Sequence, residues 1–469
     1  MSDDTTLDEF VETQDSKRDD SDESGIESDE THPRFGKLPP GWSINEIADI
    51  AEVVGGSTPS TDNDDYWGGS IPWATPTDIT ALLGNTISET ADTITEEGLE
   101  SASTHLLPPY SVLMTSRASI GKCAVNTVEM ATNQGFKNLV PKKGIETWYL
   151  YYRMLESANF LNSLGSGSTF DEVSKTEVQS VDIPIPPLAQ QRKIATVLYT
   201  VDQAIAKTEE IIEQVKRVLD GTLNDIFTRG LNKSGNLRQP PDDSPESYDE
   251  SRRFSVPVDW NVDSLQDLCD ENITYGIVQP GPHVEGGVPY INTEDMTDGD
   301  IPKEGLNRTS EEIAKKYSRS EIHTGELVVT IRATVGAVDQ VPPDLDGANL
   351  TRGTARVVPG DSVSNRFLLW AIRSNAIQSE FDIRVKGTTF DEINLEQLGK
   401  VPIPYPEDKN EQREIVNILS SIDSQIENEE TYLKSLKRLK QGLQQDLLSG
   451  KVRTTDTNIE VPNEIAQHG

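Results

Sequence analysis

One passage of this chain occurs twice, about 220 positions apart. Gly-Ser-Thr-Phe-Asp-Glu-Val at residues 167–173 returns as Gly-Thr-Thr-Phe-Asp-Glu-Ile at residues 387–393. Shortly after each copy, Ile-Pro-Ile-Pro at 183–186 returns as Ile-Pro-Tyr-Pro at 403–406. The spacing is far longer than the roughly 20–50 residues of a solenoid repeat, so the sequence indicates a duplicated domain. Two similar halves would present two similar surfaces, and the natural target is one with two half-sites.

A long helical pattern follows each copy, opened by Gln-Arg at 191–192 and at 412–413. Apolar residues then alternate at spacings of four and three over about four to five heptads, which predicts helices that pair lengthwise. Each helix of about 38–40 residues would be roughly 55–60 Å long. Because a globule separates them in one chain, we expect an antiparallel coiled coil. The residues predicted to pair the helices include Ile194, Leu198, Val201, Ile205, Ile415, Leu419, Ile422 and Ile426.

Shorter landmarks recur ahead of each helix, and they are β-branched segments bounded by Gly or Pro. Residues 113–121 resemble 328–336, and Ala-Thr-Asn at 131–133 resembles Gly-Ala-Asn at 347–349. Such segments are typical of strands, so each globule is predicted to have a mixed α/β (α+β) fold. The predicted order is tail, globule, helix, linker, globule, helix and tail, at residues 1–34, 35–187, 188–230, 231–253, 254–406, 407–453 and 454–469.

The formal net charge of −37 is the most unusual value in the composition. The first 30 residues hold thirteen Asp or Glu residues against Lys17 and Arg18, and the 1–34 tail is predicted to be disordered. The remaining acidity is dispersed along the chain. We interpret it as the acidic surface of a halophile; the alternative is a protein that avoids nucleic acid. In molar salt, base-edge hydrogen bonds and shape would supply most of the affinity for DNA.

Cysteine usage and hydropathy indicate a cytoplasmic protein. Cys123 and Cys269 are the only cysteines and fit no metal or disulfide pattern, which favours a reducing compartment. The chain has no apolar run of about 18 residues, so no membrane span is predicted. The acidic N-terminus does not resemble a secretory signal.

The sequence contains no recognisable active site. The five His residues lie at no metal-ligand spacing, and Gly-Ser-Gly at 165–167 is an isolated fragment better interpreted as a turn than as a phosphate loop. The catalytic motifs of P-loop enzymes, amino-methyltransferases, nucleases and nucleophilic triads are not found. The chain is therefore predicted to be non-catalytic and to bind no cofactor or metal itself.

Polar residues around the predicted strands are the candidates for DNA contact. Arg, Lys, Asn and Gln are the side chains that read guanine and adenine edges, Arg and Asn or Gln with two hydrogen bonds each. Loops at 55–59 and 275–279 are candidates to lie along a phosphate backbone. Arg117 and Arg332 are favoured because they occupy matching positions in the two repeated segments. The predicted DNA-binding set is Arg117, Lys122, Asn133, Gln134, Lys137, Arg332, Asn349 and Arg352.

Taken together, these motifs resemble the specificity subunit of type I restriction-modification enzymes. The resemblance covers about residues 35–453 and depends on the combination of Thr-Phe-Asp-Glu, Ile-Pro-x-Pro, Gln-Arg and the heptad helix in each half. It implies that each globule is a target recognition domain that reads one half of a split, asymmetric site in double-stranded DNA. It also implies assembly with two methyltransferase subunits and with restriction subunits. S-adenosylmethionine, ATP and magnesium are then expected on those partners.

The helices of such a subunit would set the distance between the two half-sites. One added heptad lengthens a helix by about 10 Å, or roughly three base pairs. Glu429 and Lys440 are charged residues at heptad positions that are predicted to pair the two helices. This suggests that the first helix does not cover the second completely, and that the uncovered part is a surface for a methyltransferase subunit. The alternative function is a coiled-coil adaptor that joins two protein partners without reading DNA.

Overall fold

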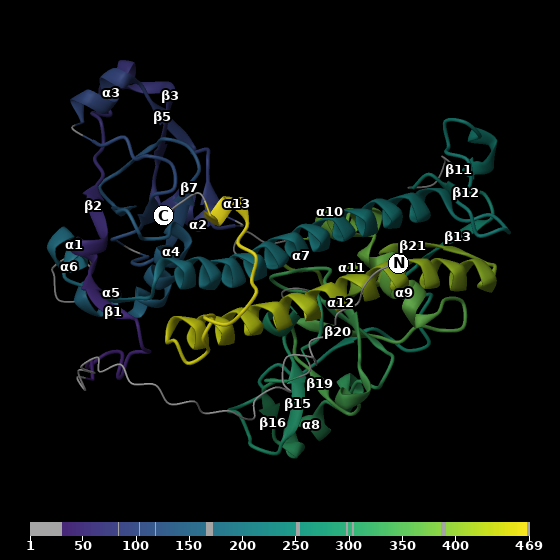
Figure 1. Ribbon diagram of the computed structural model, residues 1–469. Coiled ribbons are helices and arrows are strands. Elements are labelled where there is room, and N and C mark those ends of the chain that lie inside the picture. Colours follow the sequence, from purple (N-terminus) through teal and green to yellow (C-terminus); the bar gives the residue numbers. More distant parts are fainter. Residues whose placement is uncertain are drawn as a thin grey trace. The chain divides into compact units, whose positions relative to one another are not determined.

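The computed structural model describes residues 31–82, 84–102, 104–117, 119–165, 172–249, 254–296, 299–302, 304–385 and 391–466. The chain divides into two compact units. Unit 1 comprises Met1–Asp202 and Leu439–Gly469, and unit 2 comprises Gln203–Arg438. Both contain helices and strands, so the predicted mixed α/β fold is confirmed (Figure 1).

Within its described residues, unit 1 contains three sheets. Neighbouring strands are antiparallel except for two parallel pairs, β4 with β7 and β3 with β8. The larger sheet has the order β2 (Ala51–Gly55), β9 (Lys137–Pro141), β6 (Val112–Met114), β7 (Cys123–Asn126) and β4 (Thr86–Ile87). The second has the order β5 (Asp92–Ile94), β3 (Trp67–Ala74) and β8 (Ala131–Thr132). The third pairs β1 (Ser43–Glu46) with β10 (Asp182–Ile185), which joins the start of the globule to its Ile-Pro-Ile-Pro segment.

Unit 2 has the same succession of sheets. Its larger sheet has the order β14 (Thr274–Tyr275), β20 (Thr354–Val357), β17 (Leu327–Thr330) and β18 (Val338–Gln340). The second has the order β16 (Arg308–Thr309), β15 (Val288–Ile291) and β19 (Asn349–Leu350), with β15 and β19 parallel. The third pairs β13 (Trp260–Ser264) with β21 (Pro402–Pro406). A further pair, β11 (Tyr248–Asp249) with β12 (Val256–Pro257), precedes the globule.

Strand register corrects one equivalence suggested by the sequence. Trp73 pairs with Ala131 in unit 1, and Tyr290, its counterpart, pairs with Asn349 in unit 2. Residues 131–133 therefore correspond to 349–351, and the sequence match to 347–349 was wrong by two positions. The next residues along the chain, Gln134 and Arg352, become equivalent.

The two units contain helices at matching positions, of which α4 packs on β6 and β7 and α9 packs on β18 of the larger sheets. The matching pairs are α4 (Thr147–Glu156) with α9 (Asn365–Arg373), α5 (Ala158–Gly165) with α10 (Asn375–Arg384), and α6 (Lys175–Gln179) with α11 (Leu395–Gly399). The other short helices are α1 (Ile47–Ile50), α2 (Pro76–Ala81), α3 (Glu96–Ser101), α8 (Glu311–Lys316) and α13 (Asn463–Ala466). Single 3-10 turns are η2 (Asp64–Tyr66), η3 (Pro245–Ser247), η4 (Thr293–Met296), η5 (Ser318–Ser320) and η6 (Pro343–Leu345).

Two long helices, α7 (Leu188–Arg229) and α12 (Lys409–Leu448), pack together, and each unit contains one end of each (Figure 1). In unit 2, Lys216 Nζ lies 2.9 Å from Glu430 Oε1, and Lys437 Nζ lies 2.8 Å from Glu209 Oε1. As residue numbers rise along α7 they fall along α12, so these segments run in opposite directions. Each helix is about 60 Å long at about 1.5 Å per residue.

The predicted pairing residues are most deeply buried near the helix ends. Ile194, Leu198, Ile415, Leu419 and Ile426 are buried, and Val201, Ile205 and Ile422 are half-buried. Near the ends, the helices also join the cores of the globules: Ile194 and Leu198 lie in one cluster with Leu447 and Leu448, and Ile415 and Leu419 lie in another with Leu223 and Ile226.

Lys440 does not provide the free surface that its position on the seam suggested. Its Nζ lies 2.5 Å from Asp202 Oδ1 within unit 1, and it also lies over the ring of Tyr152, 5.9 Å from the centroid. Tyr152 and Asn85 each donate a hydrogen bond of 2.7 Å to Asp202 Oδ2. The Lys440 ammonium is therefore engaged inside the fold, as the ion partner of a buried carboxylate.

Parts of the predicted tail and linker have defined contacts. Residues 1–30 of the predicted disordered tail lie outside the described residues, but His32 Nε2 lies 3.1 Å from Asp182 Oδ2 and Arg34 donates to Ser157 Oγ at 2.9 Å. In the predicted linker, Arg238 forms ion pairs with Asp259 at 2.5 Å and with Glu411 at 2.9 Å. In the C-terminal tail, Ile465 is buried in the core of unit 1.

Candidate nucleic-acid interface

The recurring strand-turn segments fold into the same tight turn in both units. Gly121 N donates to Thr115 O, and Gly336 N donates to Thr330 O, each at 2.9 Å. The hydroxyls of Thr115 and Thr330 donate to Ser119 O and Thr334 O respectively, across the turn. Gly121 and Gly336 have φ of +85° and +93°, a region that favours glycine.

Each of these glycines also lies against a helix. A Cβ on Gly121 would lie 2.6 Å from Ala158 Cβ, and a Cβ on Gly336 would lie 2.9 Å from Cδ2 of Phe381. Real Cβ atoms do not approach so closely, so both the backbone conformation and the helix packing require glycine. The turn therefore fixes the backbone position from which the side chain of Arg117 or Arg332 extends.

That arginine is held by the glutamate of the Phe-Asp-Glu motif in both units. Arg117 Nη2 lies 2.8 Å from Glu172 Oε2, and Arg332 forms an ion pair with Glu392. The backbones also form isolated β-bridges, Arg117 with Glu172 and Arg332 with Glu392. We call each pair the Arg–Glu clasp. The clasps explain why the two motifs recur together, although most of each motif, residues 166–171 and 386–390, lies outside the described residues.

Unit 1 adds a second cation to its clasp. Lys137 Nζ lies 3.1 Å from Glu172 Oε1 and 3.2 Å from Ser116 Oγ, and the side chain is buried. Burial alone would raise the pKa of Glu172, but hydrogen bonds from Arg117 and Lys137 outweigh it and lower that pKa below its usual value. The charge of Arg117 is therefore largely balanced by Glu172, and its guanidinium is held in one orientation.

The eight predicted DNA-binding residues fall into three groups by exposure. Arg117, Lys122, Gln134 and Arg352 are exposed, Asn133 and Arg332 are half-buried, and Lys137 and Asn349 are buried. Asn349 Oδ1 accepts from Ser320 Oγ at 2.7 Å inside unit 2, and Asn133 Oδ1 accepts from Gly135 N at 2.8 Å within its own turn. A base edge must reach the side chain that reads it. Lys137, Asn349 and Asn133 thus make internal contacts in the structure, and their role in DNA binding stays a prediction.

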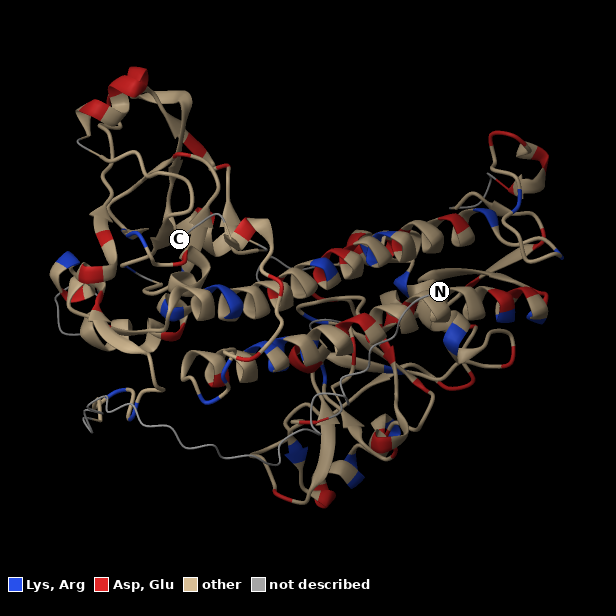
Figure 2. Cartoon of the chain, in the orientation of Figure 1, with Lys and Arg blue, Asp and Glu red and all other residues tan. Residues whose placement is uncertain are grey.

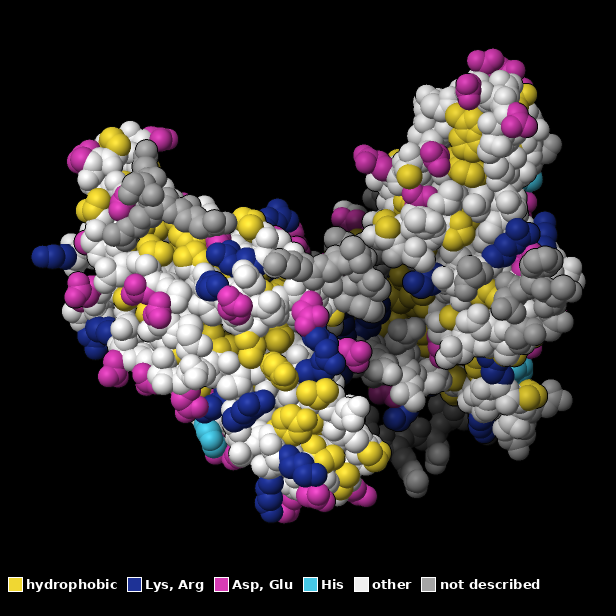
Figure 3. Space-filling view, turned by 180° about the vertical axis from the view of Figure 1, so that it is seen from behind, with side chains coloured by type: hydrophobic (Ala, Val, Ile, Leu, Met, Phe, Trp, Pro, Cys, Tyr) yellow, Lys and Arg dark blue, Asp and Glu magenta, His cyan; other side chains and the backbone are white. Residues whose placement is uncertain are grey.

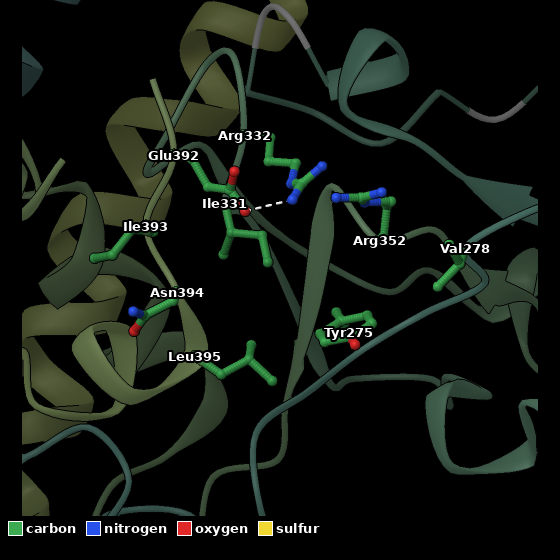
Figure 4. Close-up of a pocket in the computed structure, with 9 residues that line it drawn as sticks. All are labelled: Tyr275, Val278, Ile331, Arg332, Arg352, Glu392, Ile393, Asn394 and Leu395. Atoms are coloured by element: carbon green, nitrogen blue, oxygen red, sulfur yellow. Dashed lines mark hydrogen bonds and ion pairs between the residues drawn. The ribbon is translucent and has the colours of Figure 1, made fainter. Parts of the chain in front are cut away.

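In unit 2, an open pocket of about 360 Å³ lies beside the clasp (Figure 4). It is lined by Tyr275, Val278, Ile331, Arg332, Arg352, Glu392, Ile393, Asn394 and Leu395. Among the residues that the structure describes, the Arg352 side chain has no hydrogen-bond or ion-pair partner. The pocket thus combines an unpaired guanidinium with two exposed apolar side chains, Tyr275 and Val278.

The equivalent positions of unit 1 carry different side chains. Gly56 and Gly276 lie against equivalent residues of the parallel strands, since a Cβ would lie 2.3 Å from Thr132 O in unit 1 and 1.9 Å from Leu350 O in unit 2. This common contact aligns the two loops and places Thr58 where unit 2 has Val278. Gln134, at the position of Arg352, accepts a hydrogen bond from Thr58 Oγ through Oε1.

Sequence reasoning did not identify the glutamates of the clasps as partners of Arg117 and Arg332. The available signal was the duplication itself, because an acidic residue recurred together with each arginine at a similar separation. Tyr275 and Val278 were included only as part of a candidate loop. Their significance depends on long-range packing between that loop and residues 331–332 and 352.

Charge alone does not mark an interface. Acidic and basic residues both occur along most of the chain (Figure 2), and the face seen in Figure 3 carries both signs, but residues 38–116 of unit 1 contain acidic residues and no Lys or Arg. Within the described ranges, no group of three or more His, Cys, Asp or Glu residues could hold a metal ion. None of the described helices is both long and apolar enough to cross a membrane.

The sequence profile of the type I restriction modification DNA specificity domain matches residues 39–217 and again residues 257–438. The chain belongs to the type I restriction-modification DNA specificity family. Each match includes one globule and most of one long helix.

Individual relatives agree with this assignment. The specificity subunit of the type I restriction enzyme MjaIX from Methanocaldococcus jannaschii is 27% identical over 431 residues, which cover 90% of this chain and 96% of the relative. The EcoBI specificity subunit from Escherichia coli is 26% identical over 294 residues, covering 60% of this chain and 61% of the relative. The crystal structure of a type I restriction-modification system S subunit from M. genitalium has a similar fold, with a TM-score of 0.54, 14% identity, and coverage of 88% of this chain and 97% of that one.

Proposed function

We propose that this chain is the DNA-reading subunit of a type I restriction-modification complex. Each unit would read one half of a split, asymmetric site in double-stranded DNA. The observation that carries the proposal is that the two units share turns, clasps and sheet order, while the side chains around the clasps differ. A common framework with different reading side chains is what two different half-sites require.

We further propose that α7 and α12 act as an antiparallel coiled coil that sets the distance between the half-sites. The ion pairs of Lys216 with Glu430 and of Glu209 with Lys437 support this, because they lie one heptad apart on both helices. The predicted boundaries at residues 35–187, 188–230, 254–406 and 407–453 are retained as recognition domains and spacer helices. The predicted partners are two methyltransferase subunits and restriction subunits in the cytoplasm.

In this proposal the chain is non-catalytic, and its partners bind S-adenosylmethionine, ATP and magnesium. The decisive experiment maps DNA methylation in the source genome with and without the gene. We expect deletion to erase one split methylation motif. Unchanged methylation would contradict the proposal and favour the protein adaptor, which needs no DNA sequence.

The ruler is tested by lengthening both helices together. One heptad is inserted between Glu209 and Lys216 in α7 and one between Glu430 and Lys437 in α12, so that the ion pairs on either side keep their register. The expected result is a spacer longer by about three base pairs with both half-site sequences unchanged. Inserting the heptad in α7 alone is the matched control, and it should disrupt pairing. A spacer of unchanged length in the double insertion would contradict the ruler.

A further inference from the structure

We infer that Gln134 and Arg352 are equivalent base-reading residues, with Gln134 selecting adenine in the half-site of unit 1 and Arg352 selecting guanine in that of unit 2. The inference rests on the proposed function and assigns chemistry to one position in each unit. It also separates these two residues from the other six of the predicted DNA-binding set.

The equivalence of the two positions comes from backbone hydrogen bonds. Gly135 O accepts from Ser116 N at 2.7 Å, and Gly353 O accepts from Ile331 N at 2.8 Å. Each glycine thus lies beside the residue that precedes the clasp arginine. Gln134 and Arg352 immediately precede these glycines, so each side chain starts from the same place relative to its clasp.

Arg352 has the chemistry for guanine. Its guanidinium is exposed at the pocket beside the Arg332–Glu392 pair and has no partner among the described residues (Figure 4). Because Glu392 pairs with Arg332, the guanidinium of Arg352 is the one in the pocket whose N–H donors are open to a ligand. Such a fork matches the O6 and N7 acceptors of guanine in the major groove.

Gln134 has the chemistry for adenine, and Thr58 orients it. The Thr58 hydroxyl donates to Gln134 Oε1, so the amide oxygen is fixed and Nε2 is directed away from Thr58. An oxygen acceptor with a second lone pair and an amide donor match N6 and N7 of adenine. Unit 2 has Val278 in place of Thr58, and an arginine fork needs no such orientation because its donors are fixed in one plane.

The test uses the full chain co-expressed with the methyltransferase subunits of its source, in a host without other DNA methylation. Methylation motifs are mapped for wild type, Arg352→Gln and Gln134→Arg. We expect Arg352→Gln to remove the requirement for one guanine in one half-site, and Gln134→Arg to remove the requirement for one adenine in the other. Arg366→Gln, an exposed arginine of unit 2 outside the pocket lining, is the matched control and should leave the motif unchanged.

Binding by the wild-type complex supplies a readout that does not depend on variants folding. Duplexes carry 7-deazaguanine or 7-deazaadenine, which lack the N7 acceptor, at one position at a time. We expect roughly ten-fold weaker binding at one guanine and at one adenine, one in each half-site. Arg352→Gln and Gln134→Arg should each lose sensitivity to their own analogue only.

The outcomes separate this inference from the proposed function. If the wild-type complex leaves no split motif, the proposed function fails. If a split motif is present but both variants keep every base requirement, or no deaza position weakens wild-type binding, the base-reading assignment is overturned. Thr58→Val is expected to relax the adenine requirement partly, since it removes only the contact that orients Gln134.

Discussion

The two units differ most where their framework does not need to be the same. Gln191 and Gln412 are both buried at the start of a long helix, and each donates at 2.9 Å to the last proline carbonyl of its Ile-Pro-x-Pro segment. These contacts repeat because they join the helix to the globule. The side chains that follow Asn133 and Thr351 do not repeat. Duplicated residues therefore hold the framework, and the unduplicated residues beside them are free to differ between the units.

The larger sheets of the two units differ in a buried ion network. In unit 2, Arg356 donates to Glu326 at 2.7 and 2.5 Å and to Glu271 at 2.6 Å. Hydrogen bonding to Glu326 raises the pKa of Arg356 and outweighs the effect of burial, which lowers it. The equivalent residue of unit 1 is Asn138, which donates to Thr132 Oγ at 2.8 Å. One unit therefore depends on paired charges where the other uses neutral groups.

Arg356→Met should have the largest effect on stability. It leaves the Glu326 carboxylate buried without an ion partner, with only the hydrogen bond from His323 N remaining, which costs about 3–5 kcal/mol of unfolding free energy. Hydrogen exchange followed by mass spectrometry should show faster exchange in β17 and β20 and unchanged exchange in unit 1. Asn138→Ala is the matched change in unit 1 and should cost about 1 kcal/mol. Adding Glu326→Gln to Arg356→Met should recover part of the loss; no recovery would mean that lost packing, and not the unpaired charge, is responsible.

The helices that pack on the larger sheets begin with different caps. Glu146 caps α4 and accepts from Tyr149 N at 2.5 Å, whereas Ser364 caps α9 and accepts from Phe367 N at 3.2 Å. Burial raises the pKa of Glu146 to about 8, although backbone hydrogen bonds and Arg192 act in the opposite direction. Among the described residues, its Oε1 has no hydrogen-bond partner. Unit 1 therefore contains a titratable cap where unit 2 has a neutral one.

Stability of unit 1 should fall as pH rises because of this cap. The folded state keeps a proton on Glu146 that the unfolded state releases near pH 4.5, so the cost appears above pH 4.5 and is complete above about pH 8. Glu146→Ser should remove this dependence and stabilise the protein by roughly 2–3 kcal/mol at pH 9. Calorimetry of the full chain at pH 5 and pH 9 tests it. Ser364→Glu is the reciprocal variant and should introduce the same dependence in unit 2; equal pH profiles for all three proteins would exclude the effect.

The long helices could be predicted from the sequence, but the contacts between distant segments could not. Heptad spacing predicted α7 and α12 because helical periodicity is a local property. The sequence alignment of 131–133 with 347–349 was wrong because it matched Asn133 to Asn349 by residue type. Strand pairing, which is seen only in the fold, matches Asn349 to Ala131 instead. Lys137 and Asn349 looked suited to DNA by side-chain chemistry. Their burial depends on Glu172 and Ser320, each about 30 residues away in the sequence, which no local pattern could indicate.

The clasps should differ slightly in strength, because unit 1 has a second cation. When Arg117 is lost, Glu172 keeps its ion pair with Lys137. When Arg332 is lost, Glu392 loses the one ion partner that it has among the described residues. We expect Arg117→Ala to cost less than about 0.5 kcal/mol and Arg332→Ala about 1 kcal/mol, both small since the pairs are partly exposed. Exchange of the Val173 and Ile393 amides, which donate to Ser116 O and Ile331 O, reports each clasp.

A double variant sharpens this comparison. Arg117→Ala combined with Lys137→Met should accelerate exchange at Val173 at least as much as Arg332→Ala does at Ile393, because Glu172 then loses both cations. Because the pKa of Glu172 is lowered in the folded protein, its ion pairs also make stability depend on pH. Their contribution to the free energy of unfolding is present above the usual pKa of a glutamate and is lost as pH falls through the lower folded value. If Arg117→Ala alone matched Arg332→Ala, Lys137 would have no part in the clasp, and its burial would reflect packing of its aliphatic stem.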